Sequence, residues 1–419
     1  MTPIRAFSFS LLLALLLTLL PLSGFAAQPD PARPMPPHKP RFLMAHYMPW
    51  FEAKPISKGW GWHWTMNHFQ PDHMTDGRRE AASYYYPLMG LYDSGDPDAL
   101  DCHVLLMKLA GIDGVLIDWY GTDDYLDYGI LQRNTLAMIR SVKKAHLRYA
   151  VVYEDQTVPK LIAGHVLPEA DAVPHGEHLM AWLQAHWFSD PAYLTLDSRP
   201  VFLVFGGAYY SSDQWSRIFA GLPRPPLFFT EEDRRAPAVG GFAWPQPQGG
   251  DAQSVRSLDR FYAAAPSWPL SIPAAWPRFH DIYGQAGTQP SYGIIDDRAG
   301  LTYANTLDRA LKSEAAVIQL VTWNDWGEGT QIEPSVEMGC RDLETTQRKR
   351  RSFDPAFHYT AQDLRLPLAL YALQKRVGSD PVRRAKLDTI SRLLFAGQLV
   401  RARALLDAYR AVPTGRRPK

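Results

Sequence analysis

The chain has 419 residues, with 44 Lys or Arg and 43 Asp or Glu, so its formal net charge is +1. This balance argues against a dedicated nucleic-acid-binding protein, which normally carries a basic excess on one patch. Hydrophobic residues make up 46% of the chain and charged residues 21%, a composition that favours a folded core and excludes global disorder.

The beginning of the chain has the pattern of a secretory signal peptide. Arg5 precedes an apolar run from Ala6 to Leu20, and a small-x-small pattern follows at Gly24-Phe25-Ala26. The run is shorter than the ~20 residues that span a bilayer. We therefore expect residues 1–26 to be removed and the mature protein to be periplasmic or secreted, with no stable membrane insertion. An uncleaved anchor is the alternative.

Residues 27–40 are predicted to be a linker. Six prolines lie between Gln28 and Pro40, and proline-rich segments favour an extended backbone over a packed element.

Strand-like segments then recur, with helix-like segments between several of them. Several strands are continuous apolar runs, such as Val201–Val204, a pattern typical of strands buried on both faces of a parallel sheet. The predicted strands are Phe42–Tyr47, Asp113–Asp118, Arg148–Tyr153, Pro200–Phe205, Pro226–Thr230, Val239–Trp244, Pro269–Ala275 and Ala315–Trp323. The predicted helices are Asp98–Ala110, Ile130–Ala145, Gly176–Trp187, Asp213–Ala220, Ser254–Ala265 and Tyr303–Ser313.

This alternation predicts an α/β fold, a (β/α)₈ TIM-type barrel over residues 41–378. A doubly wound open sheet is the alternative, but no G-x-G-x-x-G follows the first strand. The chain then ends in a small helical extension over residues 379–419. Tyr359–Arg376 is expected to be the last barrel helix, and Pro381–Leu394 with Gln398–Tyr409 a helical hairpin before a basic tail.

Two smaller features complete this outline. The basic cluster Arg348–Arg351 is predicted to be a solvated loop. Export would place Cys102 and Cys340 in an oxidising compartment, where they either pair or remain two independent thiols.

Polar and aromatic side chains follow most of the predicted strands, where barrels of this kind carry their functional groups. We take the following as candidate contacts to a ligand: His46, Tyr47, Asp118, Trp119, Tyr120, Glu154, Glu231 and Asp281. Carboxyl groups alternating with aromatic rings suit carbohydrate cleavage, which needs a proton donor, a second carboxylate and flat faces that pack on sugar rings. For each carboxylate the alternative is structural, as a helix cap or as the partner of an arginine.

Asp325 and Glu328 form the strongest candidate catalytic pair. They lie three residues apart after the last apolar strand, a spacing that places both carboxylates on one side of a turn. Burial against indole and the neighbouring like charge would raise one pKa and leave an acid and a base at neutral pH. Asn324 directly precedes the pair and Trp326 lies between its two members, and both are predicted to contact the substrate. The alternative is a Trp-rich turn with two solvated acids.

The segment from His46 to Tyr86 carries ten aromatic residues and four histidines in 41 positions. Trp50 and Trp62 are predicted to line a polysaccharide cleft, and packing under the barrel rim is the equal alternative. His63, His68 and His73 recur every five residues, which does not keep them on one helix face. We therefore predict no metal site and no cofactor.

Three stretches resemble glycoside hydrolase families 71 and 99. They are His46-Tyr47-Met48-Pro49-Trp50-Phe51, Gly111–Gly121 and the motif Trp323-Asn324-Asp325-Trp326-Gly327-Glu328-Gly329-Thr330-Gln331-Ile332-Glu333-Pro334. Asp325 stands where the family 99 pattern N-E-W-x-E has its first glutamate. The form W-N-D-x-G-E is nearer family 71, whereas G-T-Q-I-E is nearer family 99.

The resemblance implies a metal-independent barrel that cuts α-linked glycans within the chain, with Glu328 as general acid and Asp325 as general base or its equivalent. Family 99 implies α-mannosides and retention through the sugar 2-hydroxyl, and family 71 implies α-1,3-glucan and inversion. The predicted function is thus an exported glycoside hydrolase whose partner is a polysaccharide or oligosaccharide substrate. A non-catalytic glycan-binding barrel in surface-polysaccharide assembly is the main alternative. An esterase is disfavoured because no G-x-S-x-G motif occurs.

Overall fold

The structure is a computed structural model that describes residues 41–206 and 209–411. The described residues belong to one compact unit. The predicted signal peptide, proline-rich linker and basic tail lie outside the described residues, and the domain boundary at residue 378 stays a prediction. Within the described ranges, no helix is long and apolar enough to cross a membrane.

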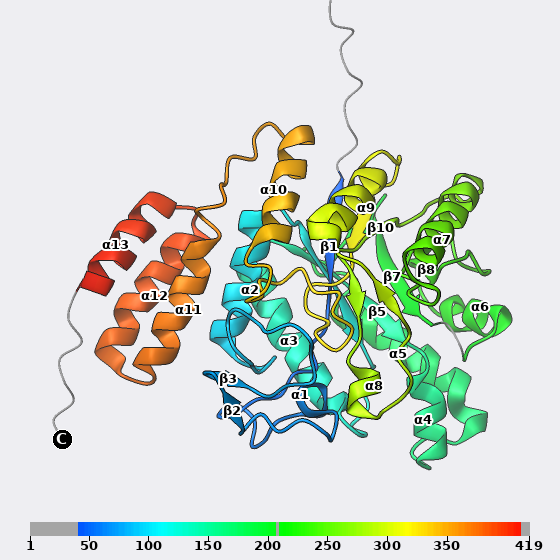
Figure 1. Cartoon of the computed structure of the whole chain (residues 1–419). Coiled ribbons are helices and arrows are strands. Elements are labelled where there is room, and N and C mark those ends of the chain that lie inside the picture. The colour runs from blue at the N-terminus through cyan, green and yellow to red at the C-terminus, as the bar shows by residue number, and fades with distance from the viewer. Residues whose placement is uncertain (1–40, 207–208, 412–419) are drawn as a thin grey trace, which may run out of the picture. The chain divides into compact units, whose positions relative to one another are not determined.

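Eight parallel strands form a barrel in chain order, which confirms the predicted (β/α)₈ fold (Figure 1). β1 pairs with β4 on one side and with β13 on the other, where Phe42 lies opposite Val317. A parallel bridge between Phe242 and Ile272 joins β9 to the segment that leads into β10 and closes the ring. The strands are β1 (Phe42–Tyr47), β4 (Gly114–Trp119), β5 (Arg148–Glu154), β7 (Arg199–Phe205), β8 (Leu227–Glu231), β9 (Gly240–Phe242), β10 (Ala274–Ala275) and β13 (Val317–Leu320).

All six helices predicted between the strands are present, but the last barrel helix is α10 and not the predicted Tyr359–Arg376. α2 shows why the predicted segments are helical: Asp96 accepts a hydrogen bond from the Asp98 N–H, Pro97 occupies the first turn, and Gly111 ends the helix in the left-handed conformation. The main barrel helices are α2 (Pro97–Ala110), α3 (Tyr128–Lys144), α5 (Ala172–His186), α6 (Ser212–Ala220), α7 (Gly250–Ala264), α9 (Leu301–Leu311) and α10 (Arg341–Phe353). The shorter elements are α1 (Trp62–Thr65), α4 (Thr157–Ala163), α8 (Tyr283–Ala286), β2 (Met74–Thr75), β3 (Arg78–Arg79), β6 (Thr195–Leu196), β11 (Phe279–His280) and β12 (Ile294–Ile295).

The prediction of a loop at Arg348–Arg351 is wrong, because these residues lie in α10. Two of the basic side chains reach carboxylates on the barrel: Lys349 pairs with Asp308 at 2.6 Å, and Arg350 pairs with Asp113 at 2.7 Å. The helix is therefore held by ion pairs to its neighbours and not by the apolar face that a sequence pattern detects.

The chain ends in three helices, α11 (Arg365–Val377), α12 (Pro381–Phe395) and α13 (Leu399–Ala411), which include the predicted hairpin. They lie in a row beside α2 in Figure 1, and α11 packs directly on α2. Asp98 of α2 joins this row to the barrel by pairing with Arg384 at 2.7 Å and Lys375 at 3.2 Å. Cys102 and Cys340 are both buried free thiols.

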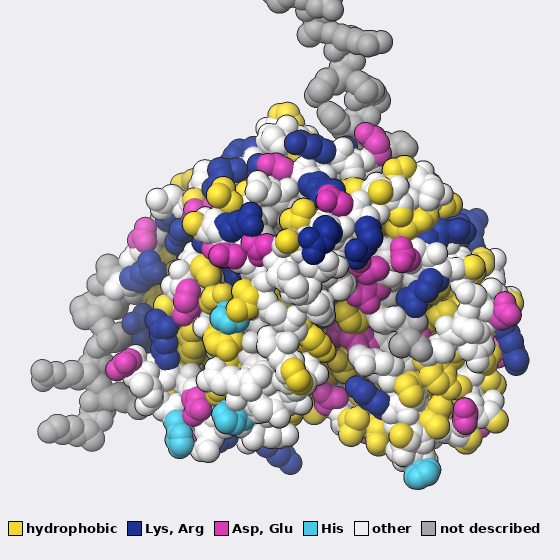
Figure 2. Space-filling view, turned by 45° about the vertical axis from the view of Figure 1, so that its right-hand side comes forward, with side chains coloured by type: hydrophobic (Ala, Val, Ile, Leu, Met, Phe, Trp, Pro, Cys, Tyr) yellow, Lys and Arg dark blue, Asp and Glu magenta, His cyan; other side chains and the backbone are white. Residues whose placement is uncertain are grey.

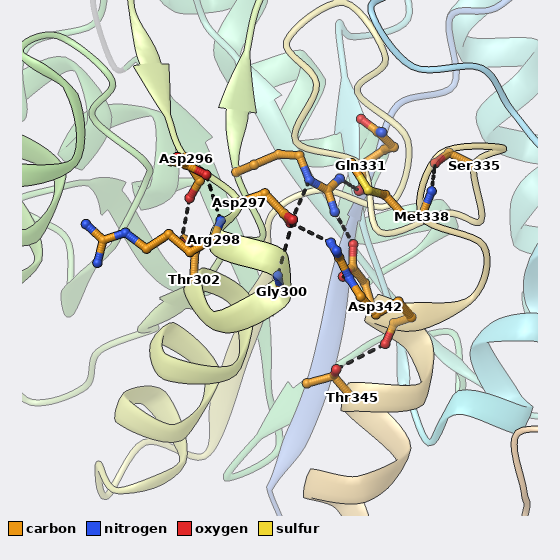
Figure 3. Close-up of polar contacts among 12 residues, drawn as sticks. Asp296, Asp297, Arg298, Gly300, Thr302, Gln331, Ser335, Met338, Asp342 and Thr345 are labelled. Atoms are coloured by element: carbon orange, nitrogen blue, oxygen red, sulfur yellow. Dashed lines mark hydrogen bonds and ion pairs between the residues drawn. The ribbon is translucent and has the colours of Figure 1, made fainter.

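An ion cluster fixes the long loop that follows β13. Arg278, which is 1% exposed, donates to Gln331 O at 2.8 Å and contacts Asp297 at 3.2 Å and Asp342. Arg341 reaches the same two carboxylates. Figure 3 shows Asp297 and Asp342 on either side of this cluster, with Gln331 beside it.

We expect Asp342→Ala to lower the free energy of unfolding by about 3 kcal/mol, because a buried arginine loses one of its two carboxylates. Glu344→Ala is the matched control, since Glu344 lies in the same first turn of α10 but pairs with the half-exposed Arg365. That control should cost less than about 1 kcal/mol. Urea unfolding of both variants measures the difference, and equal losses would contradict a structural role for the cluster.

Candidate active site

A cavity of about 220 Å³ lies at the carboxyl ends of the barrel strands. Three carboxyl groups enter it, from Glu154 at the end of β5 and from Asp325 and Glu328 in the turn after β13. Figure 2 shows acidic side chains in a hollow of the molecular surface, between hydrophobic ones. The remaining lining residues are His46, Met48, Trp50, Phe51, Trp62, His63, Met66, Tyr120, Gln156, Phe205, Trp244, Tyr283 and Gly327.

Hydrogen bonds within the turn set the positions of Asp325 and Glu328. The Glu328 N–H donates to Asp325 Oδ1 at 3.0 Å, and the Asp325 N–H donates to Thr322 Oγ1 at 2.8 Å. Tyr283 donates its hydroxyl to Glu328 Oε1 at 3.3 Å. Gly329 has a φ of +67°, and a Cβ there would lie 2.7 Å from His280 O, so only glycine lets the turn approach this strand.

The environment separates the protonation states of the two acids. Burial raises the pKa of Asp325 to about 7, repulsion from Glu154 adds to the shift, and the N–H groups of Glu328 and Gly327 oppose it. Burial, followed by the charge of Asp325, raises the pKa of Glu328 well above its usual range. At neutral pH Glu328 therefore holds a proton while Asp325 is partly ionised, as a neighbouring acid and base require.

Aromatic rings also line the cavity. Trp50 stacks on His63 with ring centroids 4.1 Å apart and planes 7° from parallel, and Trp62 is 42% exposed at the rim. His46 meets Trp244 edge to face at 4.9 Å. Such rings offer flat faces to sugar rings while remaining largely rigid.

Two predicted residues, Tyr47 and Trp119, do not line the cavity. Successive side chains of a strand point to opposite faces, so His46 enters the barrel while Tyr47 points outward and lies 3.4 Å from His103 of α2. Trp119 likewise points outward and donates to Gln132 of α3 at 2.7 Å. Both are completely buried between strand and helix.

Asn324 and Trp326 are also placed away from the cavity, and they hold the loops that shape it. Asn324 accepts from the Met48 N–H at 2.8 Å and donates to Met48 O at 2.9 Å, which fastens the end of β1 to the turn after β13. The Trp326 indole N–H donates to the buried Glu333 at 3.1 Å.

Three predicted acids lie near the cavity without lining it. Asp281 accepts from Ser291 at 2.9 Å and from the Tyr292 N–H at 2.8 Å, so it shapes the loop that carries Tyr283. Glu231 accepts from the Gly206 N–H at 2.9 Å, and burial raises its pKa to about 7. Asp118 lies beneath Glu154 inside the barrel and is 1% exposed.

Several lining residues were not predicted. Phe205 and Trp244 end predicted strands, and the same strand-end rule would have found them had apolar rings been included. Tyr283 begins the short helix α8, which follows β11 and has no sequence pattern of its own. His63, which in the sequence stands out only as one of the histidines that recur every five residues, lines the cavity and stacks on Trp50. Across the described ranges, no group of three or more His, Cys, Asp or Glu is arranged to hold a metal ion.

The fold and the cavity together define a (β/α)₈ barrel with neighbouring carboxyl groups in a site lined by aromatic rings. No family model matches the chain. The chain is 23% identical over 336 residues to the glycoprotein endo-α-1,2-mannosidase of Rattus norvegicus, covering 70% of this chain and 68% of that protein. It is 20% identical over 283 residues to a Danio rerio protein described as like that enzyme, covering 61% of this chain and 60% of the relative.

Solved structures agree with the fold. The family 99 endo-α-mannosidase of Bacteroides thetaiotaomicron superposes with a TM-score of 0.55 at 19% identity, covering 74% of this chain and 98% of that one. A glycoside hydrolase-like protein gives a TM-score of 0.52 at 14% identity, with 77% and 97% covered. The chain is thus similar in sequence to glycoprotein endo-α-1,2-mannosidases and in fold to a family 99 endo-α-mannosidase, in agreement with the resemblance of the motif after the last strand to family 99. The resemblance to family 71 stays a prediction.

We expect the stability of the protein to fall as the pH decreases from about 6.5 to 4, in part because of His46. Burial lowers the pKa of His46 to about 4, so the unfolded chain binds the proton first and native stability from this group is lost in that window. The contribution is about 3 kcal/mol.

His46→Gln removes this titration, so its unfolding free energy should fall less than that of the parent between pH 7 and pH 4. His178→Gln, an exposed position on α5, is the control and should follow the parent. A His46→Gln profile parallel to the parent profile would contradict a neutral, buried imidazole. Urea unfolding at each pH measures both.

Proposed function

We propose that the protein is a glycoside hydrolase that cleaves α-linked mannose-containing glycans within the chain. The observation that carries this proposal is the pair Asp325 and Glu328, two carboxyl groups in one aromatic-walled cavity whose environments hold them in different protonation states. The similarity to endo-α-mannosidases supports the substrate class.

Glu328 is the general acid in this proposal. It carries a proton at neutral pH, and Tyr283 holds its carboxyl group by a hydrogen bond. As the glycosidic bond breaks, Glu328 gives that proton to the departing oxygen, so that the leaving group departs as a neutral hydroxyl.

Asp325 is the general base. Its pKa of about 7 makes it an efficient proton acceptor near neutral pH. In the retaining course, Asp325 takes the proton of the sugar 2-hydroxyl, whose oxygen attacks C1 and forms a cyclic intermediate. Glu328, now ionised, then takes a proton from the water that attacks C1, and Asp325 returns its proton to the 2-oxygen as the C1–O2 bond of the intermediate breaks. In the inverting course Asp325 activates a water directly.

The aromatic lining binds the sugar rings. Trp50, His63 and Trp244 present flat faces, and Trp62 stands at the rim, where a longer glycan would pass. His46, whose imidazole is neutral, and Glu154 supply hydrogen-bonding groups to sugar hydroxyls at the bottom of the cavity. A screen against α-mannans and α-1,3-glucans with reducing-end detection tests the substrate class. Binding without cleavage would favour the glycan-binding barrel.

Glu328→Gln should lower turnover by about 10²–10⁴-fold on a glycan with a poor leaving group, because the amide keeps the shape but donates no acidic proton. A substrate with an activated leaving group needs that proton less, so part of the rate should return. Asp325→Asn should show no such rescue, since activation of the attacking oxygen is needed whichever group departs.

The matched control for this pair is Glu314→Gln, the same change at an exposed residue before the start of β13. It should retain parental rates on both substrates. The rates come from initial-velocity measurements with paired substrates. Near-parental activity of Glu328→Gln on the poor leaving group would refute the assignment of the acid.

Export is a separate proposal, carried by the apolar run Ala6–Leu20 and by Gly24-Phe25-Ala26. We expect mass spectrometry of the periplasmic or secreted protein to find a new amino terminus near Ala27. An exported protein that still begins at Met1 would contradict it.

A further inference from the structure

Asp118 is a buried carboxyl group that the proposed mechanism does not use. It stands on the inward face of β4, opposite Val152 in the register with β5, and is 1% exposed. No side-chain N–H or O–H group of the described residues donates to either of its oxygens, and no described arginine or lysine forms an ion pair with it. An ionised carboxylate in that position would carry a large desolvation cost, with only the Trp119 N–H to oppose it.

The group that faces Asp118 from β5 is another carboxyl. Glu154 follows Val152 by two residues, so it points to the same inward face. The turn after β13 contributes Asp325, whose charge also acts on Asp118. On the other side of Glu154, Gln156 donates to its carboxylate, Lys160 of α4 contributes a positive charge and Asp155 a negative one. Tyr120 lies near both acids.

Two carboxylates offer only acceptors to each other, so a hydrogen bond joins them only when one carries a proton. Burial and the charge of Glu154 both raise the pKa of Asp118 well above its usual range. The contact has the opposite effect on Glu154, where donation from Asp118 opposes the upward shift in pKa that burial causes. The proton therefore belongs on Asp118, as in other pairs of neighbouring acids that ionise one at a time.

We propose that Asp118 is a protonated positioning residue: it donates a hydrogen bond to Glu154, which holds the Glu154 carboxylate toward the cavity as the acceptor for a sugar hydroxyl. This inference rests on the proposed function for its substrate, but the shared proton itself is a property of the free protein. Glu154 lines the cavity and Asp118 does not, so Asp118 acts through Glu154.

The neutral state of Asp118 also limits the charge around the general base. Glu154 already raises the pKa of Asp325, which stands at about 7. An ionised Asp118 would place a further negative charge near the same group and keep Asp325 protonated at neutral pH, where it must accept a proton.

Difference infrared spectroscopy tests the shared proton without any substrate. The carbonyl band of a protonated carboxylic acid should be present in the parent at pH 7, and one such contribution should be lost in Asp118→Asn. An unchanged acid band, with loss of a carboxylate band instead, would show that Asp118 is ionised and would overturn the proposal. Because this readout needs no glycan, it remains decisive if the proposed activity fails.

Kinetics test the positioning role. Asn at position 118 can still donate to Glu154, whereas Ala cannot, so Asp118→Asn should keep about tenfold more kcat/KM than Asp118→Ala, mainly through KM. The acid limb of the kcat/KM profile should keep its midpoint in Asp118→Asn, because no charge is removed. A shift of that limb to lower pH would mean that a negative charge next to Asp325 had been lost, and it would contradict the proposal. Thermal unfolding of both variants checks that they fold.

Discussion

The buried carboxylate of Glu333 is the point on which the geometry of the site depends. It accepts hydrogen bonds from Tyr92 at 2.8 Å and from the Trp326 indole at 3.1 Å, and it lies 3.1 Å from His103 of α2. These partners come from the loop after β1, the turn after β13 and the second helix. A fully buried carboxylate is tolerated only when such donors surround it. Satisfying this one group therefore brings three separate parts of the chain together.

The aromatic rings and the acid pair of the cavity are tied at the same place. Asn324 bonds both backbone groups of Met48 and reaches the Tyr92 hydroxyl at 3.1 Å. Trp50, Trp62 and His63 of the aromatic lining follow Met48 in sequence, and the acid pair follows Asn324. Their separation is therefore fixed by buried hydrogen bonds and not by the flexibility of two surface loops, which is the preorganisation that catalysis by charged groups needs. Asn324 and Trp326 belong to the same sequence motif as the acid pair but do not line the cavity. They hold the loops around it by hydrogen bonds.

Much of the fold followed from the sequence because several of the eight strands are short, continuous apolar runs. Because the apolar residues are continuous along these strands, the sequence does not indicate which side chains face into the barrel. In Phe42–Tyr47 apolar and aromatic residues occupy both faces, so no alternation indicates that His46 enters the barrel while Tyr47 does not. The sequence pattern did not predict helix α10, because the helix is held by ion pairs with carboxylates that lie far away in the sequence. The acid pair could be predicted because both residues lie in one local turn, whereas Tyr283 and Trp244 reach it only through the closure of the barrel.

The pairing of β1 with β13 has a consequence for how the protein is made. During synthesis the amino-terminal part of the chain is made first. β1 can then pair with β4 along one edge, but its other edge stays open until Val317–Leu320 has been synthesised. Open edges of apolar strands invite association with other chains, and contacts this distant in sequence form slowly. The turn that bears Asp325 and Glu328 follows that final strand directly. A nascent or truncated chain that stops before β13 therefore lacks both the closed sheet and two of the acids of its centre.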